Sequence, residues 1–330
     1  MNRFRLFALI LALPALLLFT SCASMQVKMG WKVYLDRTPI SSMEASLPQG
    51  PAIAPGQKSP LVITFQQPDG KILTTQGAGG GKVLWQDLKV SATVVTVNQK
   101  GVLSLPKDPR QSDGKQGHVI VTVPSHPGLR AELDVPFRYN LAFVANFSGA
   151  SGSSGSDGTN GSDGLSGSSG SIDPNNPSPG GDGGNGSDGG NGSNGGDGGN
   201  APPVSVRVAF RAGPPALLQI SVVAAGKTNY FLVDAQGGSL TVRADGGSGG
   251  SAGKGGHGGR GGMGGSGTPS GNNGHDGMNG HDGFSGSQGR GGLITITYDP
   301  LAKPYLGLIH TSSQNGPKPV FLEASVAPLW

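Results

Sequence analysis

The stretch that decides the fold is residues 180–200, which read GGDGGNGSDGGNGSNGGDGGN. Glycine stands at every third position from Gly180 to Gly198. The residue after each of these glycines is Gly or Ser, and the third residue of each triplet is Asp or Asn. Glycine destabilises the interior of an α-helix by about 1 kcal/mol per residue, so this stretch does not form an α-helix. A strict period of three is typical of extended left-handed helices with three residues per turn.

Three other stretches keep the same period. We call residues 149–170 run 1, residues 180–200 run 2, residues 247–265 run 3 and residues 271–292 run 4. A link that contains Pro174, Pro177 and Pro179 joins runs 1 and 2, and a link around Pro269 joins runs 3 and 4. Two strands that end side by side in one β region can be joined by such an out-and-back excursion. We therefore expect two long hairpins, in which each extended run reaches about 68 Å.

Three structures are compatible with this pattern. The runs resemble the Gly-X-X helices of springtail antifreeze proteins and of some phage tail-tip adhesins, and this resemblance implies a bundle of polyglycine-II helices within one chain. A collagen-like trimer also needs glycine at every third position, but its stability depends on proline, which these triplets lack. Flexible Gly/Ser linkers are the third possibility, although a linker needs neither a strict period nor matched lengths.

The bundle makes specific predictions about individual residues. Runs 2 and 3 carry small residues on two faces and are expected inside the bundle, with runs 1 and 4 at its edges. We expect the polar side chains between the glycines to be displayed outward. The glycines expected to pack against neighbouring runs are Gly152, Gly158, Gly164, Gly183, Gly189, Gly195, Gly250, Gly256, Gly262, Gly274, Gly280 and Gly286.

The two hairpins differ in charge. Residues 149–200 contain six Asp and no Lys or Arg, which gives −6. Residues 246–292 contain three Lys or Arg against two Asp, which gives +1, together with three histidines. Opposite fields of this kind would guide the hairpins together, although exposed ion pairs contribute only about 0–1 kcal/mol each.

The N-terminal residues read as an export signal. Arg3 and Arg5 precede an apolar run from Leu6 to Phe19 that is too short to span a membrane as a helix. The sequence Leu18-Phe19-Thr20-Ser21-Cys22 resembles the lipobox of bacterial lipoproteins, which implies lipidation at Cys22, the only cysteine. By the same resemblance, Ala23 implies transport to the outer membrane. An ordinary cleaved signal with an incidental cysteine is the alternative.

The remaining chain has the pattern of an all-β protein, with short alternating apolar runs between turns. We expect a signal peptide at 1–21, a lipidated tether at 22–29, a β-sandwich at 30–137 and a second β domain at 138–330 with inserts at 149–200 and 246–292. Strands are expected at 61–65, 82–85, 89–97, 118–123 and 131–137 in the sandwich. In the second domain they are expected at 138–147, 204–211, 217–224, 230–234, 239–244, 293–298 and 320–326.

Part of the sandwich resembles bacterial Ig-like domains of the intimin and invasin type. Residues 95–102 read VTVNQKGV, and residues 117–123 read GHVIVTV. This resemblance implies a hairpin followed by a strand that begins with glycine, in an Ig-like sandwich. We expect Trp85 to belong to the core of that sandwich.

Composition and motifs exclude several functions. Glycine makes up 61 of 330 residues and charged residues only 13%, which does not fit one globular enzyme. Removal of Arg3 and Arg5 leaves a net charge of only about +2, so we expect no nucleic-acid partner. We find no catalytic constellation and expect neither an enzyme nor a cofactor. His275 and His281 are weak metal-ligand candidates, because they lie six residues apart on one face of a threefold helix.

These observations predict an outer-membrane lipoprotein with a structural or adhesive role at the cell surface. The expected contacts are the membrane, through the lipid anchor, and extracellular glycans, matrix or other envelope proteins. Ice binding and a collagen-like trimeric stalk are the alternative functions.

Overall fold

The computed structural model describes residues 26–27, 29–76 and 81–330. The expected signal peptide and Cys22 lie outside these residues. Strands make up 31% of the structure and helical segments 7%, which confirms the all-β class. The chain divides into two compact units. Unit 1 holds the described residues up to Leu141 together with Tyr230–Gly238 and Trp330, and unit 2 holds Ala142–Asn229 and Ser239–Leu329.

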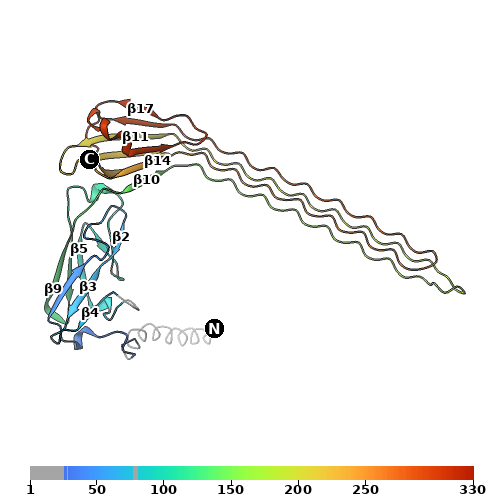
Figure 1. Cartoon of the computed structure of the whole chain (residues 1–330), viewed down its shortest axis with the longest axis horizontal. Helices are drawn as coiled ribbons and strands as arrows, with labels where there is room; N and C mark the ends of the chain where they lie inside the picture. Colours follow the sequence, from blue (N-terminus) through green and yellow to red (C-terminus); the bar gives the residue numbers. More distant parts are fainter. Residues whose placement is uncertain (1–25, 28, 77–80) are drawn as a thin grey trace, which may run out of the picture. The chain divides into compact units, whose positions relative to one another are not determined.

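Unit 1 consists of three small antiparallel sheets and short 3-10 turns (Figure 1). The sheets have the strand orders β1-β3-β4, β2-β7-β6 and β5-β8-β9. The strands are β1 (Ser42–Ser46), β2 (Lys58–Pro60), β3 (Val62–Gln66), β4 (Ile72–Thr74), β5 (Lys89–Thr93), β6 (Thr96–Val97), β7 (Val102–Ser104), β8 (Gly117–Val123) and β9 (His126–Val135). The 3-10 turns are η1 (Leu35–Arg37), η2 (Trp85–Asp87) and η3 (Pro109–Gln111).

The core of unit 1 follows from the alternation of its strands. In β8, Val119, Val121 and Val123 are buried while the residues between them are only half-buried. These side chains pack with Phe65 and Leu103 from the other sheets in one hydrophobic cluster. Period-two alternation with one buried face is what a sheet covered on one side requires.

Two expected strands of unit 1 are corrected by the structure. Residues 82–85 do not form a strand: Val83 makes only an isolated bridge with Val33, and Trp85 begins η2. The Trp85 ring packs at the edge of the core, against Gly101, where a Cβ would overlap it. The single strand expected at 89–97 is broken into β5 and β6 by Val94, whose φ is 66°.

Unit 2 contains two sheets with many parallel pairs. The sheet β10-β14-β16 is parallel throughout, and the sheet β13-β12-β11-β15-β17 contains the parallel pairs β11–β15 and β15–β17. The elements are β10 (Ala142–Asn146), β11 (Val204–Arg211), β12 (Leu217–Ala224), β13 (Lys227–Asp234), β14 (Ser239–Arg243), β15 (Ile294–Tyr298), η4 (Pro300–Leu308), β16 (Ile309–Ser312) and β17 (Val320–Glu323).

The two glycine-rich hairpins leave one sheet of unit 2 and return to the other. Runs 1 and 2 lie between β10 and β11, and runs 3 and 4 lie between β14 and β15 (Figure 1). The expectation that each hairpin joins strands of one sheet region is therefore wrong. Because both hairpins cross between the sheets in the same direction, β14 pairs in parallel with β10, and β15 pairs in parallel with β11.

Candidate functional site

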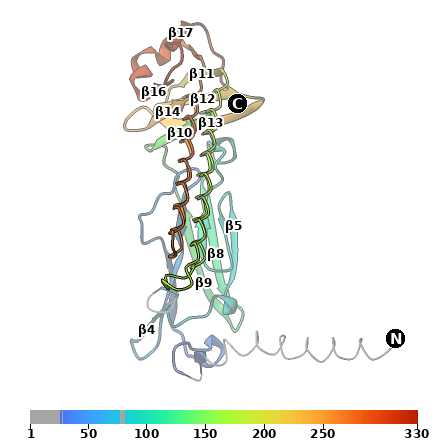
Figure 2. The same ribbon diagram turned by 90° about the vertical axis from the view of Figure 1, so that its right-hand side faces the viewer.

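The four runs form a rod held together by backbone hydrogen bonds between neighbouring runs. Figures 1 and 2 show them side by side along their whole length. The N–H of each first-position glycine donates to a carbonyl oxygen of another run. Gly158, for example, donates to Lys254 at 2.7 Å, and Gly256 donates to Gly190 at 2.9 Å. An isolated extended helix leaves these groups to water, whereas here they are satisfied within one chain.

Runs 2 and 3 form the centre of the rod. Run 2 hydrogen-bonds to runs 1, 3 and 4, and run 3 hydrogen-bonds to runs 1, 2 and 4. Runs 1 and 4 each bond only to the two central runs in these contacts. This arrangement agrees with the expectation from the small residues of runs 2 and 3.

Glycine is required at the first position of each triplet, where the backbones of two runs come closest. A Cβ atom at the first position of a triplet would overlap the backbone of the adjacent run. In run 3 the third position is equally crowded, since a Cβ at Gly255 or Gly258 would overlap run 4. The overlaps include all the glycines singled out from the sequence, namely Gly152, Gly158, Gly164, Gly183, Gly189, Gly195, Gly250, Gly256, Gly262, Gly274, Gly280 and Gly286.

The Asp and Asn side chains have a role that sequence reasoning missed. Each Oδ1 in a long row on run 2 accepts the backbone N–H of a second-position residue of run 4, as in Asp188 to Met278 (2.7 Å) and Asn191 to His281 (2.8 Å). The full row of acceptors is Asp182, Asn185, Asp188, Asn191, Asn194, Asp197 and Asn200. We call these side-chain-to-backbone bonds the ladder.

The ladder continues in the other grooves of the rod. On run 1, Asp157 and Asp163 accept the N–H groups of Lys254 and Arg260, both at 2.7 Å. On run 4, acceptors such as Asp282 take glycine N–H groups of run 3. Between runs 1 and 2 the acceptors are serine hydroxyls such as Ser187. The acidic and amide side chains of the ladder are exposed, as expected, and in addition one oxygen of each binds the neighbouring backbone.

The register of the ladder is inherited from the sheets. The pairs of β10 with β14 are 97 residues apart, as are Asp157 and Lys254 on runs 1 and 3. The pairs of β11 with β15 are 90 residues apart, as are Asp188 and Met278 on runs 2 and 4. The rod is thus an extension of both sheets in unbroken register.

The second positions of runs 3 and 4 carry most of the large exposed side chains of the rod, and Leu165 of run 1 is exposed as well. Met263, Met278 and Phe284 are exposed, the last by 77%. Lys254, His257 and Arg260 share run 3, and His275 and His281 share run 4. Side chains three residues apart in such a helix are about 9 Å apart along the axis. The rod therefore presents single, widely spaced side chains and no enclosed pocket in the described contacts.

The structure gives His275 and His281 no shared metal site. Six residues of a threefold extended helix span about 19 Å, so one ion cannot contact both imidazoles. Within the described residues, no group of three or more His, Cys, Asp or Glu side chains is arranged to hold a metal. The backbone N–H groups of the two histidines donate to Asn185 and Asn191, as part of the ladder.

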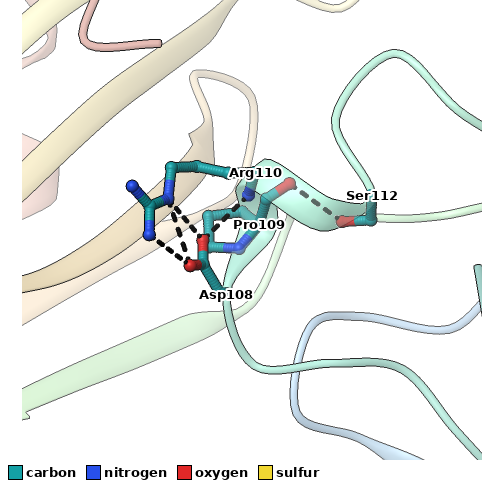
Figure 3. A network of polar contacts seen from close by, with 4 residues as sticks. All are labelled: Asp108, Pro109, Arg110 and Ser112. Carbon is teal, nitrogen blue, oxygen red and sulfur yellow. Dashed lines mark hydrogen bonds and ion pairs between the residues drawn. The ribbon is translucent and has the colours of Figure 1, made fainter.

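A second polar cluster lies in unit 1, around η3 (Figure 3). The Arg110 guanidinium donates to both oxygens of Asp108, and this bond holds the pKa of Asp108 below its usual value. Arg110 also stacks on the ring of Tyr230, 3.8 Å from its centroid. Trp330 contacts the same ring edge-on and donates to Asp113 at 2.8 Å. These contacts join Tyr230 and Trp330 to the segment around η3 within unit 1.

The remaining observations concern the expected lipid anchor and the similarity of the chain to known proteins. Cys22 lies outside the described residues, and within them no helix is long and apolar enough to cross a bilayer. The sequence matches no protein-family model. No curated protein is significantly similar to it.

Proposed function

We propose that this chain is a lipid-anchored protein of the bacterial outer membrane, which presents an intramolecular bundle of polyglycine-II helices as a structural or adhesive element. The hydrogen bonding of the four runs carries this proposal. Each first-position glycine donates to a neighbouring run, and the ladder occupies many of the remaining N–H groups. A chain that builds a rod of this order uses its glycine for packing rather than for flexibility.

The finer fold of unit 1 belongs to the same proposal. We infer an Ig-like sandwich. Antiparallel pairing throughout its sheets supports this, as do the β6–β7 hairpin and strand β8, which begins at Gly117. In this reading unit 1 lies between the anchor and the rod along the sequence, and it needs no chemistry of its own. We propose no catalytic activity and no cofactor.

The collagen-like trimer has less support than the single-chain bundle. A triple helix uses the glycine N–H groups for bonds between chains, and here they donate to carbonyls of the same chain. Analytical ultracentrifugation of the mature chain separates the two, since the bundle requires a monomer with an ordered rod.

Adhesion is the function that the exposed side chains of the rod support best. The ladder leaves the second-position side chains of runs 3 and 4 facing solvent, among them Met278 and Phe284. Isolated exposed apolar and cationic groups on a rigid rod suit contacts with glycans, matrix or other envelope proteins. Their wide spacing favours many weak contacts over one tight site.

A deletion experiment tests the adhesive function. Cells that display the full chain are compared with cells that display a variant without both hairpins, at equal surface amounts measured by an antibody to unit 1. We expect the deletion to lower binding to immobilised glycans, to matrix or between cells. Unchanged binding in all three assays contradicts adhesion.

Ice binding is a second candidate, because one face of the rod is uncharged and its side chains are small except for that of Leu165. The second positions of run 1 are Ala150, Ser153, Ser156, Thr159, Ser162, Leu165 and Ser168, and they lie beside the Gly and Ser residues of run 2. Thermal hysteresis of the purified mature chain tests this candidate. The adhesive proposal predicts none.

A further inference from the structure

The start of the described chain brings exposed apolar and basic side chains together in unit 1. Met29 and Trp31 are exposed by 48% and 63%. The Lys32 ammonium donates to the Gly81 carbonyl, and the Lys82 ammonium donates to the Gly30 carbonyl, both at 2.7 Å. We call the set Met29, Trp31, Lys32, Arg37 and Lys82 the foot.

The foot has an excess of positive charge. Burial lowers the pKa of Lys32, and repulsion from the nearby Lys82 ammonium lowers it further. Arg37 stacks on Tyr34 and lies 3.8 Å from the carboxylate of Asp36, which offsets one charge. A pocket of about 500 Å³ opens between these residues, lined by Val27, Gly30, Lys32, Val33, Tyr34, Arg37 and Thr38.

Chain length ties the foot to the expected lipid anchor. The Gln26 carbonyl accepts the backbone N–H groups of Trp31 (2.9 Å) and Lys32 (3.2 Å), so both residues lie directly beside Gln26. Gln26 follows Cys22 by four positions in the chain, a separation that spans at most about 14 Å. A lipid on Cys22 therefore holds the foot within reach of the headgroups.

We propose that the foot docks on the anionic headgroups of the leaflet that carries the Cys22 lipid. The inference rests on the proposed lipid anchor. Trp31 supplies an amphipathic ring of the type enriched at membrane interfaces. Lys32, Lys82 and Arg37 supply the attraction to anionic lipid, and the pocket lined by Lys32 and Arg37 is large enough for a headgroup. Anchor and foot together give unit 1 two points of attachment, which fix its orientation on the membrane.

The test uses the mature chain from residue 22, coupled through its only cysteine to a maleimide lipid in vesicles. Vesicles of phosphatidylcholine are compared with vesicles that also contain phosphatidylglycerol. The readout is the emission of Trp31 and its quenching by brominated lipid, with Trp31→Phe identifying its contribution. We expect a blue shift and quenching on the anionic vesicles and their loss at high salt.

Variants separate docking from other causes. Without coupling, Lys32→Gln/Lys82→Gln in a Cys22→Ser chain should lower partitioning onto anionic vesicles about 25-fold, at about fivefold per charge. Lys32→Arg/Lys82→Arg keeps the charges and should retain binding. Lys107→Gln/Lys115→Gln, which flank η3 elsewhere in unit 1, should bind like the wild type.

Three results overturn the proposal: equal Trp31 quenching on both vesicle types, quenching that is insensitive to salt, or wild-type partitioning of the Lys→Gln pair. If the Lys32→Gln/Lys82→Gln chain misfolds, binding by the Lys32→Arg/Lys82→Arg chain and the salt dependence of the wild type still test whether the foot docks on anionic lipid. The coupled vesicles supply their own anchor, so a failure of the foot is distinct from a failure of lipidation. Labelling of cells with a radioactive fatty acid tests lipidation at Cys22 separately.

Discussion

Replacement of Gly259 by alanine tests the close packing of runs 1 and 3 in the rod. Gly259 is a buried first-position residue of run 3, and its N–H donates to Ser187 of run 2 at 2.9 Å. A Cβ at this position would lie far closer than 3.0 Å to the carbonyl oxygen of Ser162 in run 1. The overlapping group is backbone, so no side chain can rotate away, and the two runs must separate.

The loss of stability on Gly259→Ala can be estimated from the neighbouring hydrogen bonds between runs 1 and 3. Gly161 donates to His257 and Gly164 donates to Arg260, both at 2.7 Å. A separation of about 1 Å takes these bonds to about 3.7 Å, beyond hydrogen-bond range. The two lost hydrogen bonds cost about 1 kcal/mol each, and overpacking costs about 1–3 kcal/mol more. Alanine also makes the unfolded chain less flexible, which stabilises the folded state by about 0.4–1 kcal/mol and offsets only part of this loss. We expect Gly259→Ala to weaken the rod by about 2–4 kcal/mol.

Gly184→Ala is the matched control. It makes the same chemical change in run 2, but its Cβ would be 3.2 Å from the nearest atom, the Leu165 nitrogen. The equivalent second positions of run 2 already carry Ser187 and Ser193. The control should therefore stay within about 0.5 kcal/mol of the wild type.

Limited trypsin digestion followed by mass spectrometry measures the difference. Lys254, Arg260 and Arg290 are the cleavage sites within the rod. Under conditions in which cleavage tracks the open population, 2–4 kcal/mol corresponds to cleavage about 30- to 700-fold faster. Equal cleavage rates for Gly259→Ala, Gly184→Ala and the wild type would refute the close packing of runs 1 and 3.

Three further predictions concern the ladder and unit 1. Asp188→Ala removes the acceptor of the Met278 N–H and should speed amide exchange there, with a loss of about 1 kcal/mol, whereas Asp188→Asn keeps the acceptor and the protection. Burial raises the folded-state pKa of Asp87, so unit 1 loses stability as the pH rises through that value. Asp87→Asn should then raise the Tm at pH 7 but not at about pH 3, and equal shifts at both would contradict this cause. Gly101→Ala places a Cβ against the Trp85 ring at a φ of 73°. It should lower the stability of unit 1 by about 2–4 kcal/mol, and an unchanged Tm and near-UV circular dichroism would rule out this contact.

The central and edge runs of the rod could be predicted from the sequence, because a column of glycine marks positions that leave no room for a side chain. At the first position of each triplet any side chain would overlap the backbone of a neighbouring run, so these crowded faces are visible as columns of glycine. Run 3, with glycine at two of its three positions, is central for this reason. Run 4, with one glycine per triplet, lies at the edge.

The ladder was not predictable in the same way, because its partners depend on register. Asp188 and Met278 are 90 residues apart, and only the pairing of β11 with β15 determines that they meet. The restriction of the third position of run 2 to Asp and Asn was the available signal. Both residues offer one Oδ1 acceptor, which points to a shared structural bond rather than to a shared charge.

Short elements of the β units were also missed. Strand β4 (Ile72–Thr74) has only three residues, and its alternation is too brief to recognise. The 3-10 segment η4 begins after Asp299, whose side chain accepts the Leu301 N–H, and the Asp-Pro pair at its start is a helix-initiation signal that was available in the sequence. Trp85 was expected in a strand because apolar residues surround it, but contact with Gly101 favours a turn there.

Hydrogen exchange of the glycine amides tests the central claim most directly. The mature chain is labelled in deuterated buffer at several protein concentrations, and peptides from residues 149–200 and 246–292 are followed by mass spectrometry. The bundle predicts slow exchange of the first-position glycine amides at every concentration, in a protein that sediments as a monomer. Exchange at the rate of an unfolded chain, or protection that appears only as the chains associate, would contradict an intramolecular rod.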